Sequence, residues 1–201
     1  MKIVISKLPK SGWWQNGIPK YDDNPAMVEG AIPDLNIVEK ERQGLISSIM
    51  NSGHEVIEFD FPNELDQNEP KHDFIFIRDS FISDQNGTAV ILRAGESQRR
   101  VENKIVKIYL EIMGMNIVEI PDEKNIPVFV IPPDDAIGTG KMIGNFAANA
   151  LPLPGVLIRP NHFTDPSIDE KLMDMGIDRI ITATSQFQLS GGSVHCMTNE
   201  L

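Results

Sequence analysis

The alternation of strand-like and helix-like segments constrains the fold of this chain more than any other feature. Residues 1–6 place Ile3 and Ile5 on one face of a strand. Residues 38–51 carry apolar side chains at helical spacing, and residues 54–61 alternate again with the period of a strand. Strands that alternate with helices are typical of α/β proteins, so we expect this class of fold.

The next segment predicts a hairpin, a helix and a strand. Residues 74–77 and 89–92 are apolar runs, and the Asn86-Gly87 pair between them is a strong tight-turn signal. Residues 99–113 have helical spacing, and residues 116–120 are predicted to form a strand. We expect this helix to have one apolar face, made of Val101, Ile105, Ile108 and Ile112. The first 120 residues therefore predict an α/β unit with a repeated ββαβ arrangement.

The second half of the chain continues the same alternation. We expect strands at residues 127–131, 155–159, 179–182 and 193–200, and helices at residues 142–151 and 168–175. The stretch from Lys7 to Pro33 is rich in Gly, Pro, Asn and Asp, which predicts a long loop, and such loops tend to be lids or binding segments. No linker divides the sequence, so residues 1–201 are predicted to form a single domain.

Composition narrows the function classes. The chain of 201 residues carries a formal net charge of −11, which argues against a nucleic-acid or anionic membrane surface. Its single cysteine excludes an internal disulfide and a tetrahedral cysteine zinc site. The N-terminal segment lacks the features of a signal peptide, and no stretch approaches the ~20 apolar residues of a membrane span. We expect a soluble, cytoplasmic protein without metal or cofactor, and homo-oligomer formation stays open.

The only cysteine, Cys196, lies in the C-terminal segment LSGGSVHCMTNEL. Gly191 and Gly192 precede it, and glycines let the backbone turn sharply and approach a ligand closely. A thiol just beyond such a turn can act as a nucleophile if the site lowers its pKa. A lone cysteine is also commonly a small buried hydrophobic residue. The residue pattern alone leaves both interpretations open.

Two carboxylates stand six residues apart in the segment HDFIFIRDS. On a strand of period two, Asp73 and Asp79 would face the same side. Carboxylates on an apolar strand are costly to bury unless they meet a cation, and the planar donor fork of a guanidinium matches their oxygens. The alternative is that Asp79 pairs with Arg78 or caps a turn.

Arginine also begins the predicted helix, in the run Gln98-Arg99-Arg100. A guanidinium at this position could hold a substrate carboxylate with two parallel hydrogen bonds. The alternative is a solvated surface pair.

Taken in order, these motifs resemble the guanidino-group-modifying enzymes of the pentein superfamily. The ordered set is FIFIRDS, TAVILRAG, ESQRRVE, NFAANALPLPG with VLIRP, and GGSVHC. The similarity is greatest to dimethylarginine dimethylaminohydrolases, arginine deiminases and amidinotransferases. The resemblance implies an α/β-propeller of five ββαβ modules around a central site.

The resemblance also implies a covalent mechanism with a small guanidino substrate and no cofactor. Cys196 would attack the guanidinium carbon, an amine or ammonia would leave, and water or an acceptor amine would resolve the amidino-thioether. By position, Asp79 would hold the guanidinium, and Asp73 and Arg99 would hold the amino-acid end. The early loop that contains Trp13 and Trp14 would be the lid.

The resemblance breaks near Asn125-Ile126. The family carries a Glu-Gly-Gly-Asp motif and a later catalytic histidine on a loop, whereas here IVEIPDEKN passes directly to IPVFVIPPDD. We therefore expect an incomplete propeller. The acid/base role is not carried over to any histidine of this chain, which are His54, His72, His162 and His195. Loss of such a group typically lowers the rate by ~10²–10⁴.

Three functions therefore compete. The leading hypothesis is a hydrolase that acts on arginine or a methylated arginine and releases citrulline. An amidinotransferase would use the same nucleophile and pass the amidino group to an amine. A catalytically inactive binder would keep Asp73, Asp79 and Arg99 without turnover, and it fits the missing histidine.

Overall fold

A computed structural model of the chain describes residues 1–8, 26, 29–62, 65, 73–84, 86–92, 99–119, 146–147, 149–163 and 166–201. The predicted lid around Trp13 and Trp14, the strand at residues 127–131 and the break near Asn125-Ile126 lie outside the described residues. The chain divides into two compact units. Unit 1 comprises Met1–Trp13, Glu55–Val130 and Cys196–Leu201, and unit 2 comprises Trp14–His54 and Ile131–His195.

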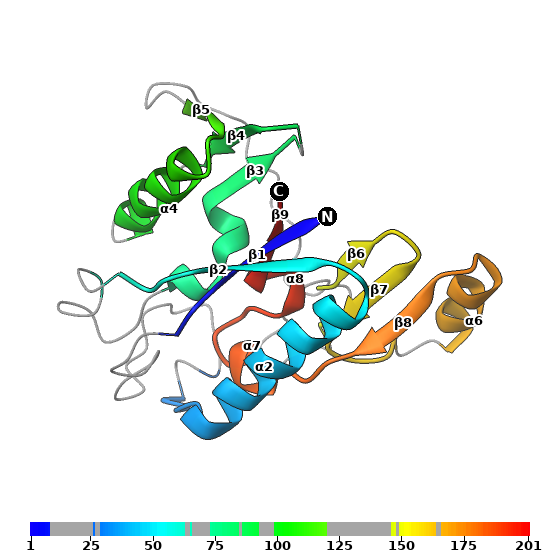
Figure 1. The fold of residues 1–201 in the computed structure, drawn as a ribbon. Helices are drawn as coiled ribbons and strands as arrows, with labels where there is room; N and C mark the ends of the chain where they lie inside the picture. Colours follow the sequence, from blue (N-terminus) through cyan, green and yellow to red (C-terminus); the bar gives the residue numbers. More distant parts are fainter. Residues whose placement is uncertain are drawn as a thin grey trace, which may run out of the picture. The chain divides into compact units, whose positions relative to one another are not determined.

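Each unit contains both strands and helices (Figure 1). Unit 1 contains β1 (Lys2–Ser6), β2 (Glu55–Phe59), the 3₁₀ turns η1 (Asp73–Ile75) and η2 (Ile77–Ser80), β3 (Phe81–Ser83), β4 (Thr88–Ile91), α4 (Arg100–Ile112), β5 (Asn116–Glu119) and β9 (Thr198–Glu200). Unit 2 contains α2 (Leu35–Asn51), β6 (Leu151–Leu153), β7 (Val156–Arg159), α6 (Pro166–Asp174), β8 (Asp178–Ile181) and α7 (Ser185–Gln188). The short helix α8 (Val194–Met197) spans the boundary between the two units.

The three sheets repeat one pairing scheme. The middle strands β1, β4 and β7 pair antiparallel with β9, β3 and β6, and parallel with β2, β5 and β8. A helix connects each parallel pair, namely α2, α4 or α6, because parallel strands need a crossover connection. Among the described residues the expected ββαβ arrangement is therefore present three times, with β9 completing the sheet of β1. No sheet closes on itself within the described ranges, and a five-module propeller is not confirmed.

The hairpin of unit 1 is confirmed, but its first strand is not at residues 74–77 as predicted. That segment forms η1 and η2, in which the Phe76 N–H donates to the Asp73 carbonyl at 2.8 Å and the Asp79 N–H donates to the Phe76 carbonyl at 3.2 Å. The strand β3 begins only at Phe81. A short apolar run that is buried throughout has no periodicity to separate a strand from a turn, which explains the error.

The turn between β3 and β4 is specified locally. Asp84 Oδ1 accepts the N–H groups of Asn86 and Thr88 at 2.8 and 2.9 Å. Gly87 has a φ of 95°, a conformation that glycine adopts without steric cost. The Asn-Gly signal therefore places this turn correctly.

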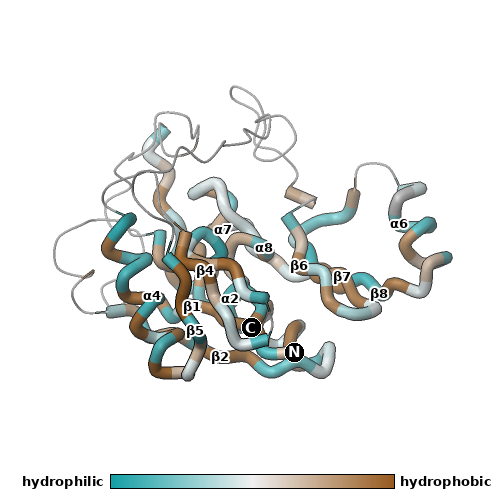
Figure 2. The backbone as a smooth tube through the Cα atoms, turned by 90° about the horizontal axis from the view of Figure 1, so that it is seen from above, coloured by the Kyte–Doolittle hydropathy of each residue, from teal (hydrophilic) through white to brown (hydrophobic). Residues whose placement is uncertain are grey.

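The helix α4 buries a different face from the predicted one. Its buried residues are Glu102, Asn103, Val106 and Leu110. Three members of the predicted apolar face, Val101, Ile108 and Ile112, are exposed. Figure 2 shows hydrophilic and hydrophobic positions alternating along this helix. The difference matters because the buried face carries the Glu102 carboxylate, which contacts the turn η1.

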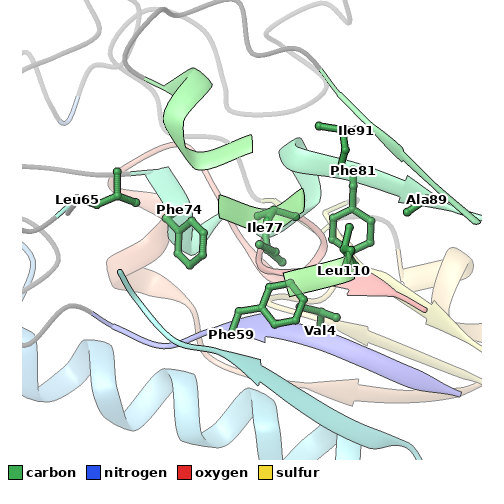
Figure 3. Close-up of a cluster of buried hydrophobic side chains, with 10 residues drawn as sticks. Val4, Phe59, Leu65, Phe74, Ile77, Phe81, Ala89, Ile91 and Leu110 are labelled. Atoms are coloured by element: carbon green, nitrogen blue, oxygen red, sulfur yellow. The ribbon is translucent and has the colours of Figure 1, made fainter. Parts of the chain in front are cut away.

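The core of unit 1 fixes those turns. Figure 3 shows the side chains of Ile77, Phe81 and Leu110 gathered beside Val4 of β1. The full cluster comprises Val4, Phe59, Leu65, Phe74, Ile77, Phe81, Ala89, Ile91, Val106 and Leu110. Because Phe74 and Ile77 are fully buried, the backbone on either side of them is held in place. Asp73 directly precedes Phe74, and Asp79 follows Ile77 by two residues.

Unit 2 is held together by buried charged groups as well as by apolar packing. Glu41 of α2 accepts the N–H groups of Ser185 and Gln186 at 2.8 and 3.0 Å and so caps the first turn of α7. The fully buried Arg159 at the end of β7 pairs with Asp169 of α6. These contacts join α7 to α2 and α6 to its sheet.

Two further predictions need correction or limitation. Among the described residues of the expected helix at 142–151, none is helical, and Leu151 begins β6. The predicted strand at residues 193–200 is divided between the helical turn α8 and the short strand β9. No helix in the described part of the chain is long and apolar enough to cross a membrane.

Candidate active site

Asp73 and Asp79 meet the same cation although they do not share a strand. Asp73 begins η1, and Asp79 lies in η2. Arg99 Nη1 donates to Asp79 Oδ2 at 2.9 Å, Arg99 Nε lies 3.9 Å from Asp73 Oδ2, and Arg99 Nη2 donates to the Asp73 carbonyl at 3.4 Å. The three residues predicted to bind substrate are thus brought together, and the guanidinium that satisfies the carboxylates here is the chain's own. Arg78, the alternative partner of Asp79, forms an ion pair with Glu200.

Sequence reasoning missed a fourth member of this cluster, Glu102. Its Oε2 accepts Arg99 Nε at 3.1 Å, and its Oε1 accepts the Asp73 N–H at 3.1 Å. Glu102 lies three residues after Arg99, the spacing at which two side chains on a helix are neighbours. The spacing alone could have predicted a contact between Arg99 and Glu102. The apolar face predicted for α4 does not include Glu102, so the carboxylate was not predicted to be buried.

The side chains of the cluster become more exposed from Glu102 to Asp79. The exposed fraction of the side chain is 4% for Glu102, 7% for Asp73, 17% for Arg99 and 44% for Asp79. A ligand that arrives from solvent would therefore meet Asp79 and the outer part of Arg99 first. The two more buried carboxylates, Asp73 and Glu102, can hold Arg99 on its side away from solvent.

The electrostatics of the cluster follow from three carboxylates around one guanidinium. Burial raises the pKa of Glu102 from 4.5 to about 7, and the positive charge of Arg99 only partly counters this. Burial works against the charged form of Arg99, but the negative charges of Glu102, Asp73 and Asp79 outweigh it and raise the pKa of Arg99. Arg99 is therefore a permanent cation, while Glu102 can change its protonation near neutral pH.

Cys196 lies on the one-turn helix α8, not on a strand as predicted. It is half-buried, and it belongs to unit 1, as do Asp73, Asp79 and Arg99. The preceding loop of unit 2 is fixed by a buried hydrogen bond of 2.7 Å between the Thr184 and Ser193 hydroxyls. In that loop Gly191 has a φ of 80°, which favours glycine.

The histidines acquire no acid/base assignment from the structure. His195 precedes Cys196 directly on the one-turn helix α8. The His195 N–H donates to Asn149 Oδ1 at 2.9 Å, which fixes its backbone. His162 Nδ1 lies 3.3 Å from Asp169 in unit 2. Over the described ranges, no three His, Cys, Asp or Glu side chains are grouped to hold a metal ion, and the prediction of a metal-free site stays a prediction.

Comparison with known proteins identifies the fold. No family model and no curated protein matches the chain. Among solved structures, the N-terminal domain of ArgZ bound to substrate, an arginine dihydrolase from the ornithine-ammonia cycle in cyanobacteria, has 15% identity and a TM-score of 0.73, with 98% of this chain and 96% of that chain covered. Dimethylarginine dimethylaminohydrolase, as an adduct with 4-chloro-2-hydroxymethylpyridine, has 14% identity and a TM-score of 0.62, with coverage of 100% and 99%. The chain has the fold of the pentein enzymes.

The resemblance predicted from the motifs is therefore confirmed at the level of fold. AgrE, in a ternary complex with ornithine and NAD⁺, has 13% identity and a TM-score of 0.71. The match covers 98% of this chain but only 39% of AgrE, so the chain spans well under half of that protein. At such low identities the likenesses show the fold alone.

Proposed function

We propose that this chain acts on the guanidino group of arginine or a methylated arginine, with Cys196 as nucleophile, and releases citrulline. The observation that carries the proposal is the convergence of Asp73 and Asp79 on one guanidinium. Two carboxylates from consecutive turns already accommodate the planar donors of Arg99, with the contact to Asp79 at 2.9 Å. The exposed Asp79 carboxylate offers a substrate guanidinium the charged acceptor that it needs, while Asp73 stays on Arg99.

The fold adds support from two of its structural neighbours. One is an arginine dihydrolase whose N-terminal domain was also obtained covalently bonded to a reaction intermediate. The other is a dimethylarginine dimethylaminohydrolase. Both names describe chemistry at a guanidino group, and this chain keeps a cysteine in its last segment.

In the proposed reaction the Cys196 thiolate adds to the guanidinium carbon, whose charge Asp79 stabilises. In the resulting tetrahedral adduct a proton passes from another nitrogen of the same group to the departing terminal amine. The carbon–nitrogen bond to that amine then breaks, and a neutral amidino-thioether is left on Cys196. Water then adds to that carbon, the carbon–sulfur bond breaks, and citrulline and the thiol are released. Arg99 binds the carboxylate of the substrate in place of the exposed Asp79 carboxylate. Arg99 keeps its buried partners throughout.

The test compares wild type with Cys196→Ala on L-arginine, methylated arginines and agmatine, with colorimetric detection of the ureido product. We expect citrulline from wild type and none from Cys196→Ala, while both bind L-arginine in calorimetry. Quenching of the wild-type reaction with acid should leave an amidino adduct on Cys196 that mass spectrometry detects. Citrulline formation that survives Cys196→Ala would overturn the assignment of the nucleophile.

A second candidate, a binder without turnover, is favoured by the absence from the sequence of the family's loop histidine and Glu-Gly-Gly-Asp motif. It predicts saturable binding of L-arginine with no product and no adduct on Cys196. Wild type that binds, forms the adduct and does not hydrolyse it would favour the amidinotransferase, and addition of an acceptor amine would then release a new guanidino compound.

A further inference from the structure

Glu102 connects two of the residues proposed to bind substrate. One carboxylate oxygen accepts Arg99 Nε, and the other accepts the backbone N–H of Asp73, each at 3.1 Å. The carboxylate therefore links the first turn of α4 to the turn η1. A second contact in the same place is the Asn103 side-chain amide, which donates to the Ser80 carbonyl of η2 at 3.3 Å.

The geometry indicates that Glu102 holds Arg99 in place, whereas Arg99 and Asp79 are the groups that a ligand can reach. Glu102 is the most buried carboxylate of the cluster and lies behind Arg99 with respect to solvent, so it does not meet a ligand itself. It occupies Arg99 Nε, and this leaves Nη1 directed at Asp79, the exposed end of the cluster. A guanidinium is rigid and planar, so fixing one edge fixes the direction of the other donors.

We propose that Glu102 is a positioning residue that holds the Arg99 guanidinium and the Asp73 turn in the orientation that binds the ligand. This inference rests on the proposed function. It assigns to Glu102 an effect on ligand affinity and none on the chemical step, because its hydrogen bonds go to Arg99 and to the Asp73 backbone, the residues proposed to hold the amino-acid end of the substrate. The groups that face it are Arg99 and Asp73, and Asp79 lies beyond Arg99.

The test measures KM and kcat for citrulline formation, and the dissociation constant of L-arginine in a Cys196→Ala background. Glu102→Gln keeps an oxygen that can accept one hydrogen bond but loses the charge-assisted bond to Arg99. We expect KM and the dissociation constant to rise about tenfold, with kcat changed less than about twofold. Glu102→Ala, if it folds, should weaken binding further.

Glu111→Gln is the matched control, because Glu111 lies on the same helix but is half-exposed. Its ion pair with Lys107 is long, at 3.9 Å. Its KM and kcat should equal those of wild type. A folded Glu102→Gln with wild-type affinity would overturn the positioning role alone, as would a fall in kcat at unchanged KM. Wild type that binds none of the guanidino compounds would overturn this inference together with the proposed function.

Discussion

At the residue scale, the cluster around Arg99 holds more carboxylates than cations. Three carboxylates surround one guanidinium, and the innermost, Glu102, is almost fully buried. Removal from water disfavours its charge more than Arg99 favours it, so the pKa of Glu102 rises to about 7. The protein therefore keeps a titratable group beside its candidate binding residues in the neutral range.

The raised pKa of Glu102 predicts a specific pH dependence of stability. Between the ordinary value of 4.5 and the folded value of about 7, the folded state binds more protons than the unfolded state. The free energy of unfolding should therefore fall as pH rises through this range, by up to about 3 kcal/mol. Glu102→Gln cannot titrate and should lack this decline.

The free energy of unfolding is measured by denaturant at about pH 5 and about pH 8. At each pH the value for Glu102→Gln is subtracted from that for wild type. The same subtraction with Glu111→Gln removes only an exposed carboxylate on the same helix and should show no comparable decline. A difference between wild type and Glu102→Gln that does not change with pH would contradict the burial argument.

At the scale of elements, the orientation of α4 decides which residues reach the site. The buried face of this helix carries Val106 and Leu110 into the core and Glu102 toward η1. Periodicity located the helix correctly but selected Val101, Ile108 and Ile112 as its inner face, and the structure exposes them. Both faces of the helix contain apolar residues, so hydrophobic spacing alone cannot tell which one the sheet covers.

Two alanine substitutions test this orientation. Leu110 has no exposed surface, whereas Ile112 is 77% exposed. Leu110→Ala should lower the free energy of unfolding by about 2–5 kcal/mol, because it leaves a cavity in the core. Ile112→Ala should change it by less than about 0.5 kcal/mol. Equal losses from the two variants, measured by denaturant unfolding, would contradict the burial of this face.

At the scale of the whole molecule, the part of the chain that the structure describes contains one pairing scheme three times, and β9 completes the sheet of β1. β9 pairs with β1 at the opposite end of the sequence, so the C-terminal segment that carries Cys196 is attached to the N-terminal strand. A ligand that binds only the folded state raises the free energy of unfolding by mass action.

L-Arginine should therefore raise the melting temperature of wild type and of Cys196→Ala. At a concentration of about 100 times the dissociation constant the gain is about 2.7 kcal/mol. Asp79→Asn should lose most of the shift, because it removes the exposed carboxylate that receives the ligand guanidinium. Asp84→Asn, in the turn before β4, provides the control for a surface aspartate and should keep the shift. An equal shift in Asp79→Asn would exclude this carboxylate from ligand binding.

The sequence by itself determined the features that depend on near neighbours along the chain. These include the strands predicted at residues 1–6 and 54–61, the helix predicted at residues 99–113, and the Asn-Gly turn before β4. It also indicated the pentein fold through the order of motifs. It singled out Asp73, Asp79 and Arg99, which the structure brings together.

Only the tertiary structure decided what those residues contact. The segment of Asp73 and Asp79 is apolar and buried, so the pattern could not separate a strand from the turns η1 and η2. Cys196 was predicted on a strand and lies on the helix α8, because a helix of four residues is too short to establish a helical period in the sequence. Glu102 reaches Asp73 because tertiary packing buries its face of α4. Hydrophobic periodicity in the sequence does not reveal such a contact between residues far apart in the chain.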